Sequence, residues 1–570
     1  MTIRKSIYPE FSTRYPLLIK NIMKTPLYMY PDDIAMVYRD DEGNYFRLTW
    51  RQWHERTCRL ANALKALNVK TGDRIAAMAL NHHWHMESIY ATICTGSISH
   101  PINVRLSPEH IAYTITHAED KIIFVDRDML PLAEALYDKI RDNVEAFIYM
   151  SDKKELPETK IRPLYAYEDL IAGQPETFDW PDLDEDIHAV LYYTTGTTGL
   201  PKGALYTQRQ IYLHSLHLTM TVNTTPSMSD DPPRPNQPIP MMNIPLFHIH
   251  AWGSPFFNVL MCSKIVLPGR FTPEGFCELV QTEKVNSTML VPTMLAMLLE
   301  YEKIDDWDLS SLTYVNIGAG ALPLGLKQKA EKRFPYMRVG SGYGMTETYD
   351  GVIRAAIKRD MAELPREEID QVMVKTGLAL VPAIDVRVVD EQGRDVPKDN
   401  ETIGEIILRG HWIMEQYYKD PERTAEAWRD GWFHTGDAAR IDSEGYITIV
   451  DRITDVIRSG SEMIPTVLLE NLTSNADFVL EAMYVGVPDE TWGELPMAII
   501  RLMPDMEASE KDVIEFLNRE GVQPGKLAKW MLPVYVAIVD EIPKTSVGKH
   551  NKKEVRKRID SFLAAAKKMR

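Results

Sequence analysis

A short stretch rich in glycine, threonine and lysine has the composition of a phosphate-binding turn. It follows the apolar run Ala189–Tyr192 and contains Thr194, Thr195, Gly196, Thr197, Thr198, Gly199 and Lys202. Glycines let the backbone approach an anion closely, threonine hydroxyls donate hydrogen bonds to it, and the lysine supplies a mobile positive charge. The stretch is not a Walker A loop, because Pro201 precedes Lys202 and Gly203 follows it. We expect a turn that holds phosphate groups with a different pattern.

A second run, Gly340–Thr348, carries groups suited to a base and a metal ion. Tyr343, followed by Gly344, offers a flat face for a base, and Thr346 offers a hydroxyl. Glu347 supplies the hard oxygen ligand that Mg²⁺ prefers. The run therefore predicts one side of a nucleotide site.

Three further motifs complete the series. Asp437 follows a glycine turn, where its carboxylate can accept both hydroxyls of a ribose, and Arg452 ends the strand pattern of residues 445–452. The last motif, Pro543–Lys549, contains two lysines, of which Lys549 is the expected functional one.

Alternating helices and strands predict the scaffold that positions these groups. Buried strands are expected at 74–80, 121–125 and 147–150, with helices at 49–66 and 86–96, and the pattern returns from 188 to 320. Such alternation is typical of a parallel sheet covered by helices. After about residue 375, short alternating strands with glycine turns predict antiparallel β structure, and a small α/β unit follows from about 455 to 570. The proline-rich segment 225–240 is expected to be a surface loop.

The composition excludes several classes of protein. The chain has 570 residues, 45% hydrophobic and 25% charged, which fits several globular domains and excludes a wholly disordered chain. A formal net charge of -17 repels a phosphate backbone, so no nucleic-acid partner is expected. Four scattered cysteines exclude a disulfide scaffold and a cysteine zinc site. With no secretory signal and no apolar run of about 18 residues, we expect a soluble cytoplasmic protein without a transmembrane segment.

The five motifs, in this order and spacing, resemble those of the adenylate-forming superfamily, which includes acyl-CoA synthetases, firefly-luciferase-like enzymes and peptide-synthetase adenylation domains. The resemblance covers residues from about 30 to 560 and is closest to medium- and long-chain fatty acyl-CoA ligases, on the segments Pro245–Trp252 and Ala528–Pro533. It implies an AMP-forming ligase with three substrates: a carboxylic acid, ATP and CoA. The carboxylate would attack the α-phosphate to give acyl-AMP and pyrophosphate, and the CoA thiol would then displace AMP.

The resemblance also implies roles for single residues. The loop 194–202 would hold the β- and γ-phosphates, with Thr194 and Glu347 near Mg²⁺, and Thr346 would reach the α-phosphate. The adenine would lie against Gly318, Ala319, Gly320, Tyr343 and Gly344, and the ribose would bind Asp437 and Arg452. His248 would lie near the acyl group and Trp252 would gate the acyl tunnel. The catalytic residues implied are Lys549, which would bridge carboxylate and phosphate, together with Lys202, His248 and Glu347.

The family architecture implies a division into two domains. Residues 1–452 would form the large N-terminal domain of helix-covered sheets with a β subdomain, which binds AMP and the acyl group, and residues 453–570 a small mobile α+β lid. The lid would rotate near Asp451–Asp455, so that Lys549 leaves and the CoA-binding loop Ser459, Gly460 and Ser461 takes its place. This loop reads S-G-S-E-M where the family often has S-G-G-E-N, and Thr454 stands where the hinge usually has Asp or Lys.

Several alternatives remain open at this point. The acid could be short, aromatic or sulfur-containing, such as dimethylsulfoniopropionate, and the acceptor could be a carrier protein. A catalytically silent acyl-adenylate sensor would not need the adenylation lysine, and a luciferase-like monooxygenase would share every motif. The resemblance suggests a homodimer. The basic stretch Lys544–Arg570 suggests either a solvated helix end or peripheral contact with an anionic membrane.

Overall fold

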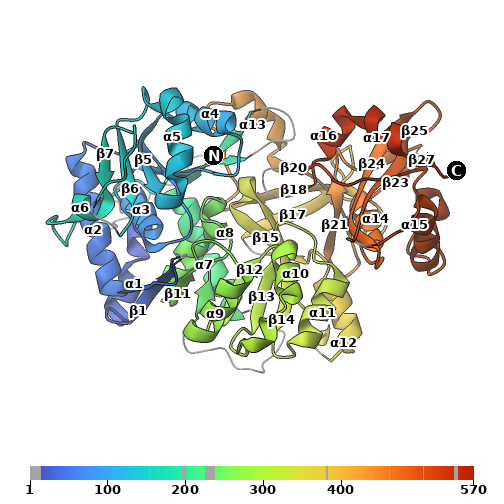
Figure 1. Cartoon of the computed structure of the whole chain (residues 1–570), viewed down its shortest axis with the longest axis horizontal. Helices are drawn as coiled ribbons and strands as arrows, with labels where there is room; N and C mark the ends of the chain where they lie inside the picture. The colour runs from blue at the N-terminus through green and yellow to red at the C-terminus, as the bar shows by residue number, and fades with distance from the viewer. Residues whose placement is uncertain are drawn as a thin grey trace, which may run out of the picture.

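Four sheets make up the strands of the described chain. The structure is a computed structural model, which describes residues 15–570 apart from 41, 153–154, 195–199, 225–237, 362, 381–382, 461, 505 and 545–549. Three sheets gather in the larger part of the molecule and the fourth forms a separate C-terminal part (Figure 1). The α/β fold class is therefore confirmed, whereas most of the predicted loop 225–240 lies outside the described residues.

The first sheet carries the phosphate-binding hairpin at one edge. Its order is β7-β6-β5-β3-β4-β8-β9, and all neighbouring pairs are parallel except the β8–β9 hairpin. The strands are β3 (Arg74–Met78), β4 (Ile98–Pro101), β5 (Asp120–Asp126), β6 (Ala146–Met150), β7 (Leu164–Ala166), β8 (His188–Thr194) and β9 (Lys202–Thr207).

Helices cover both faces of this sheet, which explains its continuous apolar strands. Ile75 and Phe124 face the core beneath α2, α3 and α6, whereas Ala76 and Ile123 face α4 and α5. The helices are α2 (Trp50–Ala66), α3 (His83–Cys94), α4 (Pro108–Ala118), α5 (Leu130–Ile140) and α6 (Tyr167–Ile171). The predicted helix 49–66 is confirmed. The helix predicted at 86–96 begins three residues earlier than expected, because the His82 side chain caps it by accepting a hydrogen bond from the backbone of His85.

The second sheet aligns its central strands so that their carboxyl ends meet at the candidate site. Its order is β16-β15-β14-β13-β12-β10-β11-β1-β2. The strands are β1 (Ile34–Arg39), β2 (Tyr45–Thr49), β10 (Pro240–Met241), β11 (Ile265–Leu267), β12 (Ser287–Leu290), β13 (Tyr314–Ile317), β14 (Arg338–Met345), β15 (Asp350–Arg354) and β16 (Leu378–Ala379). Alternate residues such as Leu290 and Ile317 pack into a core with helices on one face. These helices are α9 (Pro273–Glu283), α10 (Pro292–Glu300) and α11 (Leu324–Arg333), and α12 (Arg366–Met373) follows them.

Two helices, α7 (Gln208–Thr224) and α8 (Ile249–Leu260), pack against each other, and α7 also contacts β9 of the first sheet while α8 contacts β15 of the second. α8 begins irregularly, since Ile249, His250, Ala251, Trp252 and Gly253 all have positive φ angles between 46° and 73°. A left-handed conformation costs about 1–2 kcal/mol for each residue other than glycine. The first turn of α8 is therefore strained and must be held by its surroundings.

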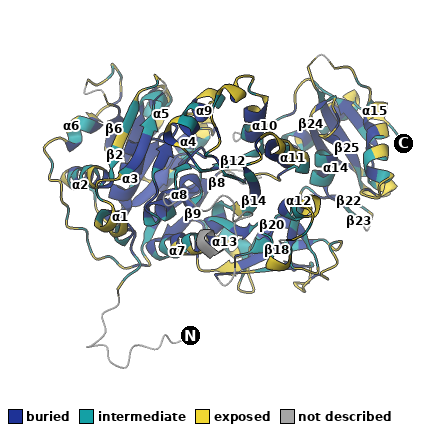
Figure 2. Cartoon of the chain, turned by 90° about the horizontal axis from the view of Figure 1, so that it is seen from below, coloured by how far each residue is buried: buried dark blue, intermediate teal, exposed yellow. Residues whose placement is uncertain are grey.

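The third sheet is antiparallel, as the glycine-punctuated pattern after residue 375 predicts. It contains β17 (Ile384–Val389), β18 (Gly404–Gly410), β19 (Trp428–Arg429), β20 (Trp432–Ile441) and β21 (Ile447–Arg452), and α13 (Pro421–Ala427) precedes β19. Its buried strands appear dark in Figure 2. The strand ends carry the remaining polar groups of the nucleotide motifs.

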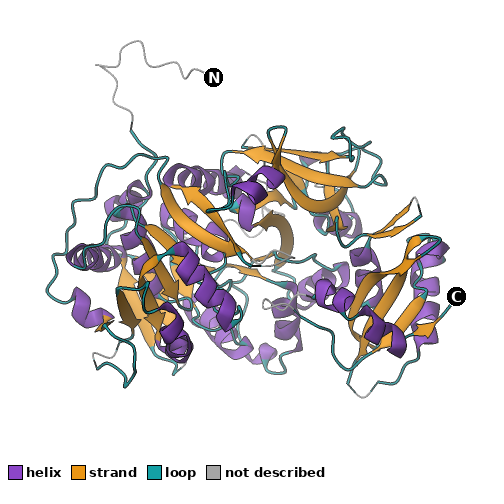
Figure 3. Ribbon diagram, turned by 90° about the horizontal axis from the view of Figure 1, so that it is seen from above, coloured by secondary structure: helices purple, strands orange, loops and turns teal. Residues whose placement is uncertain are grey.

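The C-terminal part has its own sheet and cores (Figure 3). Its strands are β22 (Ile457–Ser459), β23 (Glu462–Ile464), β24 (Val479–Asp489), β25 (Gly493–Leu502), β26 (Tyr535–Ile538) and β27 (Lys567–Lys568). Its helices are α14 (Thr466–Thr473), α15 (Glu510–Leu517), α16 (Lys552–Lys557) and α17 (Ile559–Ala565).

Basic residues near the C-terminus form ion pairs within the chain. Lys552 lies 2.9 Å from Glu470, and Arg556 lies 2.6 Å from Asp455. No helix of the described residues is long and apolar enough to cross a membrane. Peripheral membrane contact and a homodimer stay predictions.

The β14–β15 hairpin offers a test of backbone packing at the site. Gly344 pairs with Gly351, and a Cβ on Gly344 would lie 1.9 Å from the carbonyl oxygen of Asp350, whereas a Cβ on Gly351 meets only an atom at 4.0 Å. Gly344→Ala should therefore lower stability by about 1–3 kcal/mol or more, while Gly351→Ala should change it little. Thermal unfolding of the two variants measures this; equal melting temperatures would contradict the close approach.

Candidate active site

One cavity of about 1980 Å³ lies where the three sheets of the larger part meet. Most described residues of the predicted site line it: Thr194, Lys202, His248, Trp252, Gly318, Ala319, Gly320, Tyr343, Gly344, Thr346, Glu347 and Arg452. Thr195, Gly196, Thr197, Thr198, Gly199, Ser461 and Lys549 lie outside the described residues. Groups predicted from motifs more than 200 residues apart therefore share one cavity.

The phosphate-loop hairpin brings a lysine close to the carboxylate predicted to bind a metal. Thr194 and Lys202 are paired across β8 and β9, at the two ends of the turn. The Lys202 ammonium lies 4.6 Å from the centre of the Tyr417 ring, and the Tyr417 hydroxyl donates a 2.8 Å hydrogen bond to Oε1 of the buried Glu347. Tyr417 thus contacts both charged groups, a role that the five sequence motifs did not indicate.

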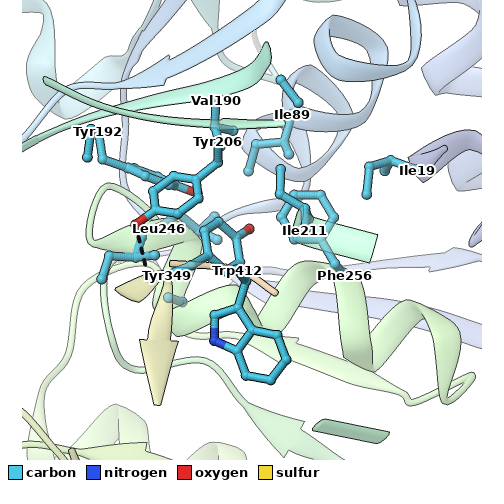
Figure 4. Close-up of a cluster of buried hydrophobic side chains, with 14 of the residues drawn as sticks. Ile19, Ile89, Val190, Tyr192, Tyr206, Ile211, Leu246, Phe256, Tyr349 and Trp412 are labelled. Carbon is cyan, nitrogen blue, oxygen red and sulfur yellow. Dashed lines mark hydrogen bonds between the residues drawn. The ribbon is translucent and has the colours of Figure 1, made fainter. Parts of the chain in front are cut away.

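Another tyrosine, Tyr206 of the β8–β9 hairpin, fixes the turn that follows β14. The Tyr206 hydroxyl donates to the carbonyl oxygen of Thr346 at 2.5 Å and accepts from the backbone amide of Tyr349 at 3.0 Å. Figure 4 shows Tyr206 and Tyr349 within the buried cluster beneath the site. The positions of Thr346 and Glu347 therefore depend on a group in β9.

Asp437 is held by two groups predicted to bind the nucleotide. The Tyr343 hydroxyl donates to its Oδ2 at 2.5 Å, and Nε of Arg452 lies 2.8 Å from its Oδ1. Burial and the nearby carboxylate raise the pKa of Tyr343 well above its usual value, so the phenol keeps its proton. Asp437 itself is not among the cavity-lining residues, but both of its partners are.

The end of β13 makes room for the indole of Trp252. A Cβ on Gly318 would lie 2.5 Å from the Trp252 ring, so only glycine allows this contact. The strained turn that carries Trp252 is held by its neighbour His250, whose Nδ1 lies 2.6 Å from the Tyr192 hydroxyl. Burial lowers the pKa of His250 well below its usual value, which keeps the ring neutral. His248 precedes this turn and lines the cavity.

A channel extends from this point along the sheet, lined by apolar side chains and by polar ones such as Thr288, Asn316 and Arg338. The cavity follows β13 and β14 along their length. It is lined at their carboxyl ends and also at their amino ends, by Tyr314 of β13 and Arg338 of β14. Its walls include Met241, Met289, Ile353, Phe257 and Met261. At about 3.3 Å per residue, the four steps from Gly318 to Tyr314 span about 13 Å.

The predicted CoA loop lies elsewhere. Ser459 and Gly460 do not line the cavity, and the backbone amide of Gly460 donates to the carbonyl oxygen of Trp492 at 2.7 Å. Instead, the C-terminal part contributes Val467, Glu470 and Asn471 of α14 together with His550. The sequence motifs gave no indication of these four residues.

Buried polar contacts join the end of β21 to the C-terminal part. The buried Asp451 carboxylate accepts a 2.9 Å hydrogen bond from the backbone amide of Thr466, at the start of α14. Lys552 contacts Thr466, Glu470 and, at 3.7 Å, Asp451. These contacts hold α14, and with it the Glu470 side of the cavity, against the predicted hinge region.

Comparisons with known proteins match nearly the whole chain. Residues 24–418 match the AMP-binding enzyme family, and residues 468–549 match the AMP-binding enzyme C-terminal domain. A long-chain-fatty-acid–CoA ligase of Thermus thermophilus is 37% identical over 533 residues, covering 93% of this chain and 94% of that protein. A 3-methylmercaptopropionyl-CoA ligase of Ruegeria lacuscaerulensis is 33% identical over 550 residues, covering 96% and 98%.

A solved structure shares the fold. ATP-bound MatB from Rhodopseudomonas palustris superposes with a TM-score of 0.79 at 24% identity, covering 96% of this chain and 100% of that one. The chain belongs to the adenylate-forming AMP-binding enzyme family, which confirms the resemblance predicted from the five motifs.

The contacts of Asp437 predict a loss of nucleotide affinity when its charge is removed. Asp437→Asn keeps the shape but removes the charge that strengthens its hydrogen bonds, so we expect ATP to bind at least about 10-fold more weakly. Asp442→Asn is the matched control, because Asp442 follows the same strand, pairs with Lys375 at 2.7 Å and does not line the cavity. Titration calorimetry with ATP measures both; equal losses would contradict a specific role for Asp437.

Proposed function

We propose that this protein is an ATP-dependent acid–CoA ligase that activates a carboxylate as acyl-AMP and then transfers the acyl group to the thiol of CoA. The observation that carries the proposal is the single cavity, which joins the phosphate-loop hairpin and the nucleotide groups to the channel along the sheet. Such a cavity lets a carboxylate at the channel mouth meet the α-phosphate of ATP. Proximity of this kind is a large part of catalysis between two anions.

Charge neutralisation would come from residues around the phosphates. The loop 194–202 would hold the β- and γ-phosphates with its amides, hydroxyls and Lys202, and Thr346 would contact the α-phosphate. Lys549 would bridge the attacking carboxylate and the phosphate. The adenine would lie near Gly318–Gly320 and Tyr343, and the ribose would bind Asp437 and Arg452, where charged hydrogen-bond partners already meet.

The oxygen groups at Glu347 suit Mg²⁺. Mg²⁺ in nucleotide enzymes takes one or two carboxylates and completes its shell with phosphate oxygens and water. Glu347 offers one buried carboxylate, whose partner Tyr417 also contacts Lys202, and Thr194 adds a hydroxyl at the end of β8. When bound with ATP, Mg²⁺ would neutralise the leaving pyrophosphate.

The length of the channel favours a fatty acid of medium to long chain. It runs about 13 Å along the strands, and its methionine, isoleucine and phenylalanine side chains offer apolar surface against which a hydrocarbon chain would be buried. Trp252, which lies on Gly318 at the start of the channel, is in a position suited to a gate. The similarity to the Thermus thermophilus fatty-acid ligase supports the same substrate class.

A second candidate is a short sulfur-containing acid. Methionines line the cavity at residues 241, 242, 261, 289, 294, 345 and 373, and their polarisable thioethers suit sulfur-containing ligands. The similarity to the Ruegeria enzyme supports this alternative. The two candidates predict opposite dependence of activity on chain length.

The CoA half-reaction would require movement of a C-terminal lid, residues 453–570. Ser459 ends β22 and Gly460 follows it, and neither of these two residues lines the cavity. Rotation about residues 451–455 would exchange the predicted CoA loop for α14, Lys549 and His550. The polar contacts of Asp451 and Lys552 would then break and re-form in each catalytic cycle.

A panel of acids tests the proposed function. Pyrophosphate release is measured with ATP, Mg²⁺ and straight-chain acids from acetate to stearate, with benzoate and 3-methylmercaptopropionate, each with and without CoA. We expect release to peak between hexanoate and palmitate, with sustained turnover only when CoA is present. A peak at 3-methylmercaptopropionate or benzoate would keep the reaction but overturn the fatty-acid substrate. No release with any acid would favour a silent sensor.

The two half-reactions separate the role of Lys549 from that of the rest of the lid. Lys549→Ala should reduce adenylate formation at least about 100-fold, because one positive charge between two anions is lost. Conversion of supplied acyl-AMP and CoA to acyl-CoA should change little. Lys544→Ala is the matched control, since Lys544 pairs with Glu481. Equal loss of both half-reactions in Lys549→Ala would contradict the exchange of lid positions.

A further inference from the structure

Several polar groups without partners among the described residues occupy one wall of the cavity. They surround Gly253, where α7, α8 and β15 meet. Ser254 is fully buried and lines the cavity, and its hydroxyl has no hydrogen-bond partner among the described residues. Both ring nitrogens of the buried His214 also have none there, and Asp350 lies beside them. Buried polar groups are normally satisfied, so this wall calls for a ligand or another explanation.

Asp350 is the charged member of this wall. It lines the cavity with 20% of its side chain exposed, and Nε2 of His214 lies 4.0 Å from its Oδ2. Asp350 has a positive φ of 97°, which is strained for a residue with a side chain. Strain of this kind is often kept where it serves a function.

No cation of the described chain neutralises Asp350. Its partner His214 is neutral, because burial lowers the pKa of that imidazole to about 3. Arg354 lies on the same face of β15, but its guanidinium is turned to β13, where it donates to the Tyr314 hydroxyl at 3.2 Å. Burial raises the pKa of Asp350 itself to about 7, against a smaller opposing effect of the Gly351 amide.

A plain hydrocarbon chain would leave these groups without partners. A buried carboxylate or hydroxyl that loses water and gains no hydrogen bond is costly. A site built to bind a substrate hydroxyl or amine therefore discriminates strongly against the analogue that lacks it. Asp350 begins β15 and pairs across the hairpin with Met345, the residue before Thr346. The group that it meets would therefore lie near the reacting carboxylate rather than at the far end of the channel.

We propose that Asp350, assisted by Ser254, is a specificity-determining residue that accepts a hydrogen bond from a donor group, a hydroxyl or an amine, carried near the carboxylate of the acid. This inference rests on the proposed ligase function and narrows its substrate class. The preferred substrate is a substituted acid, and the remainder of its chain occupies the channel.

The test compares matched acids of one length. Steady-state kcat/KM is measured for decanoate, for 2-, 3- and 4-hydroxydecanoate and for 3-aminodecanoate, with the full chain, ATP, Mg²⁺ and CoA. We expect at least one substituted acid to exceed decanoate about 10-fold or more, as for a hydrogen bond to a charged group. Preference for a hydroxy acid identifies a neutral donor, and preference for the amino acid identifies a cation paired with Asp350.

Two variants show whether Asp350 causes the preference. Asp350→Leu should bring the ratio between substituted and plain acid to about one or below, with decanoate turned over at least as well as before. Asp350→Asn retains the shape and an acceptor oxygen, so its ratio of substituted to plain acid should lie between the ratios of the unmodified chain and of Asp350→Leu. If Asp350→Leu does not fold, Asp350→Asn provides the test. Glu426→Gln, which changes a carboxylate on another part of the cavity, should keep the ratio of the unmodified chain.

Two results would overturn the inference. One is a chain that prefers decanoate to every substituted acid or treats them alike. The other is a preference that survives unchanged in both Asp350 variants. If decanoate is turned over without any preference, only this inference fails. If no acid gives pyrophosphate, the proposed ligase function fails, and this inference fails with it.

Discussion

One buried hydroxyl group fixes the geometry on which the site depends. Tyr206, in the strand that leaves the phosphate-binding turn, donates to Thr346 and accepts from Tyr349. Its hydroxyl therefore ties the first sheet to the turn of the second sheet that carries Glu347 and Asp350. Since both hydrogen-bonding capacities of the hydroxyl are used inside the protein, a shift of either sheet would leave buried groups unsatisfied. The position of the turn at Thr346 and Glu347 relative to the β8–β9 hairpin is thereby set by the core.

The same core holds the strained turn at the channel mouth. Tyr192, Tyr206, Tyr349 and Trp412 pack together beneath the cavity (Figure 4). Tyr192 also bonds to His250, within the run of left-handed residues that positions Trp252. Local strain of this kind persists only where surrounding contacts over-determine it. The contacts of the buried tyrosines thus support both the nucleotide side and the acyl side of the cavity.

Sequence reasoning found the groups whose chemistry is local and missed those that depend on tertiary contact. Lys202 and Glu347 stand in recognisable motifs. The contact between Tyr417 and Glu347 joins residues 70 apart, and nothing in the sequence around Tyr417 specifies its partner. The parallel strands could be predicted from their apolar runs. The left-handed turn at Ile249–Trp252 could not, because none of these four residues is a glycine. Asp350 was missed because its proposed importance lies in the absence of a neutralising cation among the described residues, which a sequence does not reveal.

In the proposed reaction, a carboxylate oxygen attacks the α-phosphate of ATP within this cavity. Decanoate or a hydroxydecanoate, labelled with ¹⁸O in its carboxylate, is converted with ATP, Mg²⁺ and CoA, and the products are analysed by mass spectrometry. The account predicts one labelled oxygen in AMP and none in pyrophosphate. Label in pyrophosphate or inorganic phosphate, or AMP formed without label, would contradict it.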